Sequence, residues 1–182
     1  MRVVSGIAGG IPLIAPKTDL RPTMDRVKGA LFDSLGEAIL NARVLDLFAG
    51  SGALGIEALS RGAASATFVE KERVAVEAIR ANLAKTRLGD KAQIHALDIF
   101  SYLHRHTVEY DFVFADPPYP KSKGERDFGA ELIGDPLLPR ALAPGGLFIL
   151  EKPPGAPVSG PGWELLRERR YGATEVAYFR RA

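Results

Sequence analysis

The sequence contains no cysteine. This absence excludes disulfide bonds, thiolate metal sites and a cysteine nucleophile, and it is typical of proteins that stay in the reducing cytosol. No run approaches the roughly 18 apolar residues of a membrane span, and the first residues lack the apolar segment of a secretion signal. We therefore expect a cytoplasmic protein with no membrane association.

The sequence also has almost no excess of positive or negative charge, because its formal net charge is only +2. The charges are unevenly distributed, however. Residues 1–30 carry five basic and two acidic side chains, and residues 161–182 carry five basic and three acidic ones. Basic ends around an acidic middle could form a phosphate-binding face, although ordinary solvated surface explains the pattern as simply.

Strands and helices alternate in the pattern of apolar residues. Five apolar runs are typical of buried strands, and they cover residues 42–48, 66–71, 91–99, 111–116 and 145–152. Helical patterns lie between them, and the first helix is expected after Thr23, with apolar residues every fourth position from Val27 to Ile39. This alternation predicts an α/β fold with a parallel sheet and helices on both faces.

The two ends of the chain depart from this alternation. Residues 2–16 read as two short strands joined at glycines, so we expect residues 1–20 to form a small N-terminal β-hairpin extension. Residues 163–181 read as two strands around Gly172, and such a hairpin must make one strand antiparallel. The 182 residues fit a single domain, with residues 21–182 as its core.

A glycine loop follows the first predicted strand, in the order G-x-G-x-x-G at Gly50, Gly52 and Gly55. Glycines allow a ligand to approach the backbone, and the helix that starts there offers free N–H groups. Glu70 ends the next strand, where a carboxylate can bind the hydroxyls of a ribose. Alone, this pattern fits NAD, FAD or S-adenosylmethionine, or a glycine turn that only permits tight packing.

Three acidic or aromatic residues favour S-adenosylmethionine. Asp46 and Phe48 stand where dinucleotide-binding folds need small apolar residues, and a carboxylate suits the cationic amino-acid end of this cofactor rather than a pyrophosphate. Asp98 ends the third strand and can accept a hydrogen bond from the adenine amino group, while the Ile99 backbone could reach a ring nitrogen. Asp98 can equally be the N-cap of the next helix.

The stretch Asp116-Pro117-Pro118-Tyr119 lies at the carboxyl end of the fourth strand, the edge that faces the ligand in open α/β sheets. The Asp116 carboxylate and the Pro117 carbonyl can accept the two hydrogens of one exocyclic amine and turn its lone pair towards a methyl donor. The two prolines hold these acceptors in place before binding, and the Tyr119 ring can stack on the base.

With these motifs the sequence resembles the S-adenosylmethionine-dependent amino-methyltransferases, whose signature is (D/N)PP(Y/F), and within them the RsmD family of 16S ribosomal RNA guanine-N2 methyltransferases. The matching stretches include RPTMDRVKGALF, VLDLFAGSGALGIEALSRGA, FVEK, FVFADPPY and YGATEVAYFRR. The resemblance implies a Rossmann-like class I methyltransferase fold, in which a seven-stranded, mostly parallel sheet has its last strand antiparallel.

The resemblance also implies the site residues. Asp116, Pro117, Pro118 and Tyr119 form the expected catalytic loop. The expected S-adenosylmethionine contacts, which are the residues at the strand ends, the glycine loop and the upstream RPT motif, are Arg21, Thr23, Asp46, Phe48, Ala49, Gly50, Ser51, Gly52, Glu70, Lys71, Asp98 and Ile99.

The implied substrate is one guanine of 16S ribosomal RNA in the 30S subunit, methylated by a monomer that needs no metal. The two histidines His104 and His106 have a spacing that could suggest a metal, but a surface helix end explains them better. We expect phosphate contacts from basic residues of the N-terminal segment and of the loop Lys121 to Arg126, although ordinary solubilising charge explains each one equally well. These residues are Arg2, Lys17, Arg26, Lys121, Lys123 and Arg126.

Other functions are not excluded by the motifs. A DNA adenine-N6 methyltransferase uses the same four-residue loop but usually needs additional chain for sequence readout. A nicotinamide-dependent oxidoreductase would explain the glycine loop and leave the DPPY stretch unexplained. An RNA-binding module with a vestigial cofactor pocket would not need intact Asp46, Glu70 and DPPY.

Overall fold

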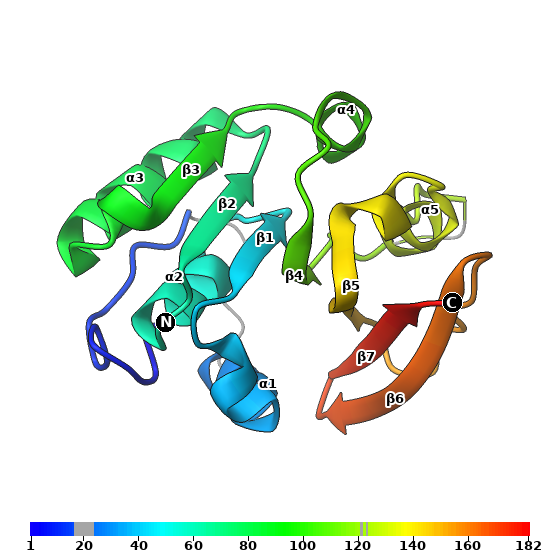
Figure 1. The fold of residues 1–182 in the computed structure, drawn as a ribbon, viewed down its shortest axis with the longest axis horizontal. Helices are drawn as coiled ribbons and strands as arrows, with labels where there is room; N and C mark the ends of the chain where they lie inside the picture. The colour runs from blue at the N-terminus through cyan, green and yellow to red at the C-terminus, as the bar shows by residue number, and fades with distance from the viewer. Residues whose placement is uncertain (17–23, 121, 123) are drawn as a thin grey trace.

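The computed structural model contains one seven-stranded sheet with the strand order β3-β2-β1-β4-β5-β7-β6 (Figure 1). The structure describes residues 1–182 apart from 17–23, 121 and 123, and apart from the side chain of Met24. The strands are β1 (Arg43–Leu47), β2 (Ser65–Val69), β3 (Ala92–His95), β4 (Tyr110–Ala115), β5 (Leu142–Lys152), β6 (Trp163–Tyr171) and β7 (Thr174–Arg181).

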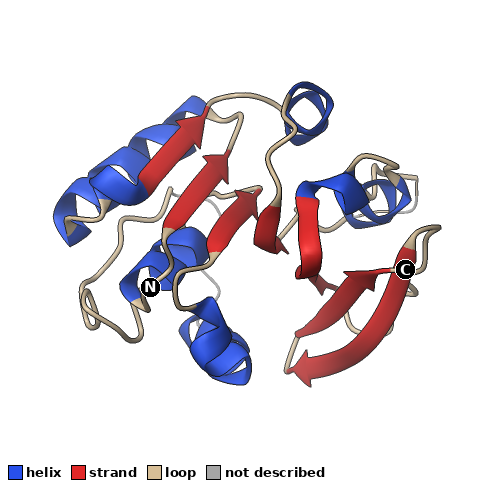
Figure 2. Cartoon of the chain, in the orientation of Figure 1, coloured by secondary structure: helices blue, strands red, loops and turns tan. Residues whose placement is uncertain are grey.

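Helices cover both faces of the sheet (Figure 2). The helices are α1 (Met24–Leu35), α2 (Ala53–Ser60), α3 (Arg73–Thr86), α4 (Ile99–Arg105) and α5 (Phe128–Gly134), with short 3-10 turns at Gly36–Ile39, Gly89–Lys91 and Leu138–Ala141. One core cluster joins α1, α2 and α3 to the sheet, and it includes Phe32, Ile56 and Ile79. The second joins α4 and α5 to the other face, and it includes Leu103 and Leu132.

The strands β1 to β5 are parallel, and only β7 runs against its two neighbours. The chain reaches β6 next and turns back at Gly172, whose φ of +62° lies in the left-handed region that glycine adopts without strain. This arrangement confirms the expected mostly parallel sheet with an antiparallel last strand. It also places the carboxyl ends of β1, β2, β3 and β4 along one edge, where the register aligns Leu47, Val69, His95 and Ala115.

Several predicted boundaries were wrong. The helix expected as far as Ile39 ends at Leu35, because Gly36 has a φ of +55° and a 3-10 turn follows it. The strand expected from residue 145 starts at Leu142, and the one expected over residues 91–99 is only Ala92–His95. The proposed N-cap Thr23 lies outside the described residues.

The expected N-terminal β-hairpin is present only as a turn with one antiparallel bridge, between Arg2 and Pro12. Val3 N donates to Ile11 O at 2.9 Å and Gly10 N donates to Val3 O at 2.8 Å, but within residues 1–16 no regular strand forms. The segment makes other hydrogen bonds instead, mainly to α2 and α3, so its backbone groups do not depend on a hairpin ladder.

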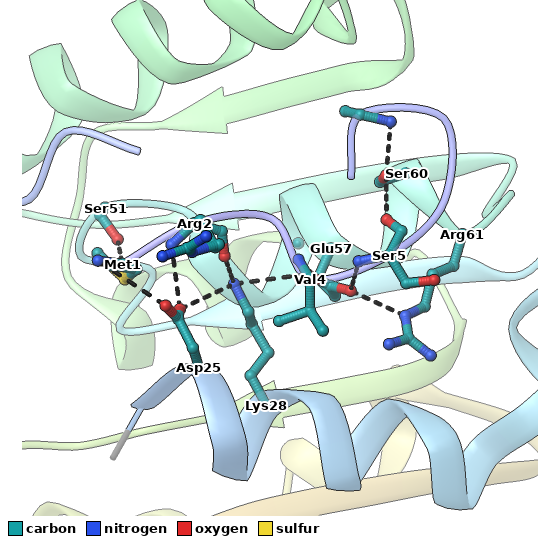
Figure 3. Close-up of polar contacts among 12 residues, drawn as sticks. Met1, Arg2, Val4, Ser5, Asp25, Lys28, Ser51, Glu57, Ser60 and Arg61 are labelled. Atoms are coloured by element: carbon teal, nitrogen blue, oxygen red, sulfur yellow. Dashed lines mark hydrogen bonds and ion pairs between the residues drawn. The ribbon is translucent and has the colours of Figure 1, made fainter. Parts of the chain in front are cut away.

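A buried polar cluster attaches this segment to the core (Figure 3). Glu57 of α2 is fully buried, and its carboxylate accepts from Val4 N at 2.7 Å and Ser5 N at 3.0 Å. Arg61 Nε donates to the same carboxylate at 2.8 Å, and Lys28 Nζ lies 3.4 Å from it. Burial lowers the pKa of Lys28, and the adjacent Glu57 opposes this shift. One carboxylate therefore joins α1, α2 and the N-terminal segment.

Candidate active site

The parallel sheet brings four acidic residues from separate parts of the sequence to its carboxyl edge. Asp46 lies near the end of β1, Glu70 directly follows β2, Asp98 lies after β3, and Asp116 directly follows β4. Ligands of open α/β sheets bind at this edge. The expected cofactor acids and the expected catalytic acid therefore border one region of the molecule.

The glycine loop between β1 and α2 is held in an unusual backbone conformation. Gly50 and Gly52 have φ angles of +54° and +78°, and Phe48 adopts a φ of +57° that is rare for a residue with a side chain. Such conformations concentrate at functional sites. At Gly55 a Cβ atom would lie 2.3 Å from Cε1 of Phe68, so this glycine allows α2 to pack closely on β2.

Asp46 is a buried carboxyl at the start of this loop. It is 1% exposed, and its Oδ2 accepts a hydrogen bond from Gly55 N at 2.9 Å. Burial raises the pKa of Asp46 to about 8; the Gly55 hydrogen bond opposes this shift, and the charge of Glu70 adds to it. The ionised form of Asp46 is therefore poorly stabilised by the protein. A cationic ligand group beside the carboxylate would stabilise it.

This burial predicts a pH-dependent difference between the wild type and Asp46→Asn. The folded protein binds the Asp46 proton more tightly than the unfolded chain, because the folded pKa is about 8 and the ordinary value is 3.8. The free energy of unfolding of the wild type therefore falls as the pH rises between these two values. The variant lacks this pH dependence, because asparagine does not ionise. We expect Asp46→Asn to gain about 1 kcal/mol relative to wild type for each pH unit from 5 to 7. Urea unfolding at several pH values measures this gain, and a constant difference would contradict it.

Glu70 supports the glycine loop as well as facing the ligand edge. Its Oε2 accepts from Gly50 N at 2.8 Å and its Oε1 accepts from Glu72 N at 2.9 Å. Each carboxylate oxygen has a second acceptor position. Binding a ribose and holding the loop are thus compatible roles for Glu70.

Asp98 is the N-cap of α4, as one of its two interpretations predicted. Its Oδ1 accepts from Phe100 N at 3.0 Å and from Ser101 N at 3.3 Å. Its other oxygen has no part in this cap, so a role in adenine binding remains a prediction. Ile99, the first residue of α4, is buried.

An aromatic cluster lies beside these acids. The rings of Phe48 and Phe128 meet edge to face at 5.4 Å, and Lys71 Nζ lies 5.9 Å from the centre of the Phe128 ring. The guanidinium of Arg126 lies over the rings of Phe128 and Phe100, at 4.5 and 5.2 Å. Aromatic rings can stack on a purine, and a purine here would share these rings with Arg126.

In the DPPY loop, Pro117 is buried, Asp116 and Tyr119 are half-buried, and Pro118 is exposed. The hydroxyl of Tyr119 lies 2.5 Å from Oγ1 of Thr174, at the start of β7. Asp116 lines a cavity with residues of α1, α2, β5 and the N-terminal segment, which are Met1, Asp25, Val27, Lys28, Leu31, Ala53, Leu54 and Glu151. The loop therefore ends at a cavity whose lining combines apolar side chains with the charged residues Asp25, Lys28, Asp116 and Glu151.

The predicted phosphate contacts are only partly placed. Lys17, Lys121 and Lys123 lie outside the described residues, as do Arg21 and Thr23 of the expected cofactor set. Arg2 and Arg26 are exposed, at the N-terminal segment and on α1. Arg126 makes hydrogen bonds of 2.7 to 2.9 Å with Glu131, so a phosphate would have to compete with that carboxylate.

Two further findings concern metals and membranes. Among the described residues, no group of three or more His, Asp or Glu side chains is arranged to hold a metal ion, and His106 stacks on Tyr102 at 4.2 Å. Within the same part of the chain, no helix has the length and apolar character needed to cross a bilayer.

Sequence reasoning missed Glu151 and Thr174. Glu151 lies inside the apolar strand β5. Thr174 lies within YGATEVAYFRR, one of the stretches that match the family, but no site role was expected there. Thr174 Oγ1 donates to Glu151 Oε1 at 2.9 Å and also meets the Tyr119 hydroxyl. Only strand pairing brings these residues, about 30 and 55 positions from the DPPY loop, to its side.

The residues present fit S-adenosylmethionine. Its cationic amino-acid end matches the buried carboxyl of Asp46, its ribose hydroxyls need acceptors such as Glu70, and its purine needs flat apolar surfaces such as Phe100 and Phe128. In the glycine loop, Gly50 and Gly52 adopt positive φ angles, and without side chains they allow a ligand to approach the backbone. A pyrophosphate, by contrast, would meet the acid at Asp46.

Comparison with known proteins agrees with this geometry. The family model described as "Conserved hypothetical protein 95" matches residues 1–180. Ribosomal RNA small subunit methyltransferase D of Escherichia coli K12 is 36% identical over 180 residues, which cover 98% of this chain and 87% of that protein. Its counterpart from Haemophilus influenzae is 32% identical over 94% of this chain and 89% of that protein.

A solved structure is similar along its whole length. The putative methyltransferase yhhF from Escherichia coli superposes with a TM-score of 0.82 at 36% identity, covering 100% of this chain and 97% of that one. This likeness supports the Rossmann-like class I methyltransferase fold. Because both the family model and these relatives extend over nearly all residues, the chain belongs to the conserved hypothetical protein 95 family, which is the RsmD family.

Proposed function

We propose that the protein is an S-adenosylmethionine-dependent methyltransferase that methylates the N2 amine of a guanine in 16S ribosomal RNA. The observation that carries this proposal is the position of Asp116: it ends β4 at the edge that holds Asp46, Glu70 and Asp98, and it lines a cavity there. The family's named members act on small-subunit ribosomal RNA.

S-adenosylmethionine, when bound, supplies a methyl group on a positively charged sulfur. The chain's own residues orient the acceptor. Asp116 and the Pro117 carbonyl accept the two hydrogens of the amine, which turns the nitrogen lone pair away from the ring plane. Tyr119 stacks on the base, and its hydroxyl is held by Thr174 at 2.5 Å. Pre-positioned acceptors reduce the reorganisation needed in the transition state.

We further propose that the substrate is an assembled or assembling 30S particle in the cytoplasm, and that the protein acts on it as a monomer. The target base must leave its stack to reach Asp116 and Tyr119. Exposed Arg2 and Arg26 lie on the N-terminal segment and α1, the elements that line the cavity, so phosphates beside the target base could contact them.

Transfer of a labelled methyl group tests the function directly. We expect incorporation into small subunits from cells that lack this methylation, with less into naked 16S RNA and none into DNA, and the label should map by mass spectrometry to N2 of one guanine. Small subunits that already carry the methyl group are the matched control. Labelling of adenine in DNA would instead establish the adenine-N6 alternative.

A further inference from the structure

Two carboxylates lie side by side next to the cavity. Ala115 of β4 pairs with Leu150 of β5 in parallel register, so the next residues, Asp116 and Glu151, are lateral neighbours. Side chains alternate along a strand, and Phe114 and Ile149, two positions earlier, belong to the core beneath α1. Asp116 and Glu151 therefore face the same side, and both line the cavity.

Glu151 is held in position by the element that also holds the catalytic loop. Its Oε1 accepts from Thr174 Oγ1 at 2.9 Å, and the same hydroxyl meets Tyr119. Thr174 is 4% exposed, so its hydroxyl is shielded from bulk water. A carboxylate can accept about four hydrogen bonds, and Glu151 can therefore receive a ligand N–H while it keeps Thr174.

The bases differ in the hydrogen-bonding group that they would present to this second carboxylate. In guanine the ring nitrogen N1, next to the N2 amine, carries a hydrogen. In adenine and cytosine the ring nitrogen next to the exocyclic amine is an acceptor with no hydrogen. A carboxylate beside the amine-binding acid therefore matches guanine, and it leaves two acceptors facing each other when adenine or cytosine enters.

We propose that Glu151 accepts the N1–H of guanine and thereby selects guanine over adenine and cytosine as the methyl acceptor. The inference rests on the proposed function and names the residue that sets its base specificity. Val27, Leu31 and Leu54 line the same cavity, so part of the surroundings of the two carboxylates is apolar.

The test compares guanine with 2-aminopurine, which keeps the N2 amine but has no hydrogen on N1. Small subunits are reconstituted with 16S RNA that carries either base at the methylated position. We expect wild-type kcat/KM to favour guanine by at least about 100-fold. In Glu151→Gln the amide can rotate to donate to N1 of 2-aminopurine, while its oxygen can still accept N1–H of guanine, so this ratio should fall at least tenfold, mainly through a higher rate on 2-aminopurine.

Two variants separate recognition from structural support. Thr174→Val removes the hydroxyl that links Glu151 to Tyr119 but keeps the carboxylate, so it should lower the rate on both bases and leave the ratio unchanged. Glu109→Gln makes the same chemical change at an exposed residue just before β4, on the opposite edge of the sheet, and should change nothing. Affinity for S-adenosylhomocysteine and the unfolding midpoint should stay at wild-type values in Glu151→Gln.

The outcomes distinguish this inference from the proposed function. If the wild type methylates guanine and Glu151→Gln keeps the wild-type ratio, or loses activity equally on both bases, Glu151 does not read N1 and the inference is wrong. If the wild type does not methylate guanine in any particle or RNA, the proposed function itself is wrong.

Discussion

Asp116→Ala is expected to lower the rate of methyl transfer by about 1000-fold, the range found when one pre-positioned polar group is removed from an active site. In the proposed mechanism Asp116, directly after β4, accepts one amine hydrogen, and alanine would leave that hydrogen without this acceptor. Asp116→Asn should keep part of the activity, because its amide oxygen still accepts. Single-turnover transfer of a labelled methyl group to small subunits measures both rates.

Binding and folding controls show whether the loss belongs to the chemical step. Affinity for S-adenosylhomocysteine should change little in Asp116→Ala, because the proposed cofactor contacts Asp46, Glu70 and Asp98 follow or end other strands. Asp111→Ala is a suitable comparison, since Asp111 lies on the same strand but accepts from Arg43 N at 2.7 Å, away from the cavity. Full activity in Asp116→Ala would contradict the mechanism.

Glu57→Gln is expected to destabilise the protein by about 3–5 kcal/mol, the usual cost of breaking a buried ion pair by removing one partner. The substitution leaves Lys28 (4% exposed) and Arg61 without their shared carboxylate. It also turns an amide N–H₂ towards either the Val4 or the Ser5 amide, each of which needs an acceptor. Folded domains are stable by only about 5–15 kcal/mol, so a large fraction of molecules would lose their native structure under mild denaturation. Urea unfolding measures the loss.

Asp33→Asn is the matched control for this charge removal. Asp33 also pairs with Arg61, at 2.8 Å, but its side chain is 73% exposed. Exposed pairs contribute roughly 0–1 kcal/mol, so we expect a change within that range. The N-terminal segment should moreover become sensitive to proteolysis in Glu57→Gln and not in Asp33→Asn. Equal effects of the two substitutions would mean that Glu57 does not anchor the segment.

Much of the fold could be predicted because it depends on local patterns. Apolar runs bounded by glycine and acidic residues predicted the parallel strands, and the turn at Gly172 predicted the antiparallel one. The acids at strand ends, Asp46 and Asp116, could be placed at one edge because parallel strands all end there. Each of these inferences needs only the side-chain period and the direction of neighbouring strands.

The N-terminal segment could not be predicted in the same way. Its apolar residues and glycines indicated a hairpin. In the structure, however, the side chains of Glu57 and Ser60 in α2 accept hydrogen bonds from its backbone N–H groups. A helix residue more than 50 positions away therefore replaces the strand partner that the local pattern predicted. No spacing within residues 1–16 reveals such an acceptor.

The amino-acid sequence by itself determined the alternation of strands and helices, the glycine loop and the DPPY loop, since these follow from local hydrogen bonding, backbone freedom and side-chain period. Only the tertiary structure decided that Glu151 and Thr174 lie beside Asp116 and Tyr119, and that Arg126 is engaged by Glu131. The reason is physical: strand register and helix packing bring distant residues together, and those contacts form only when the whole sheet has assembled.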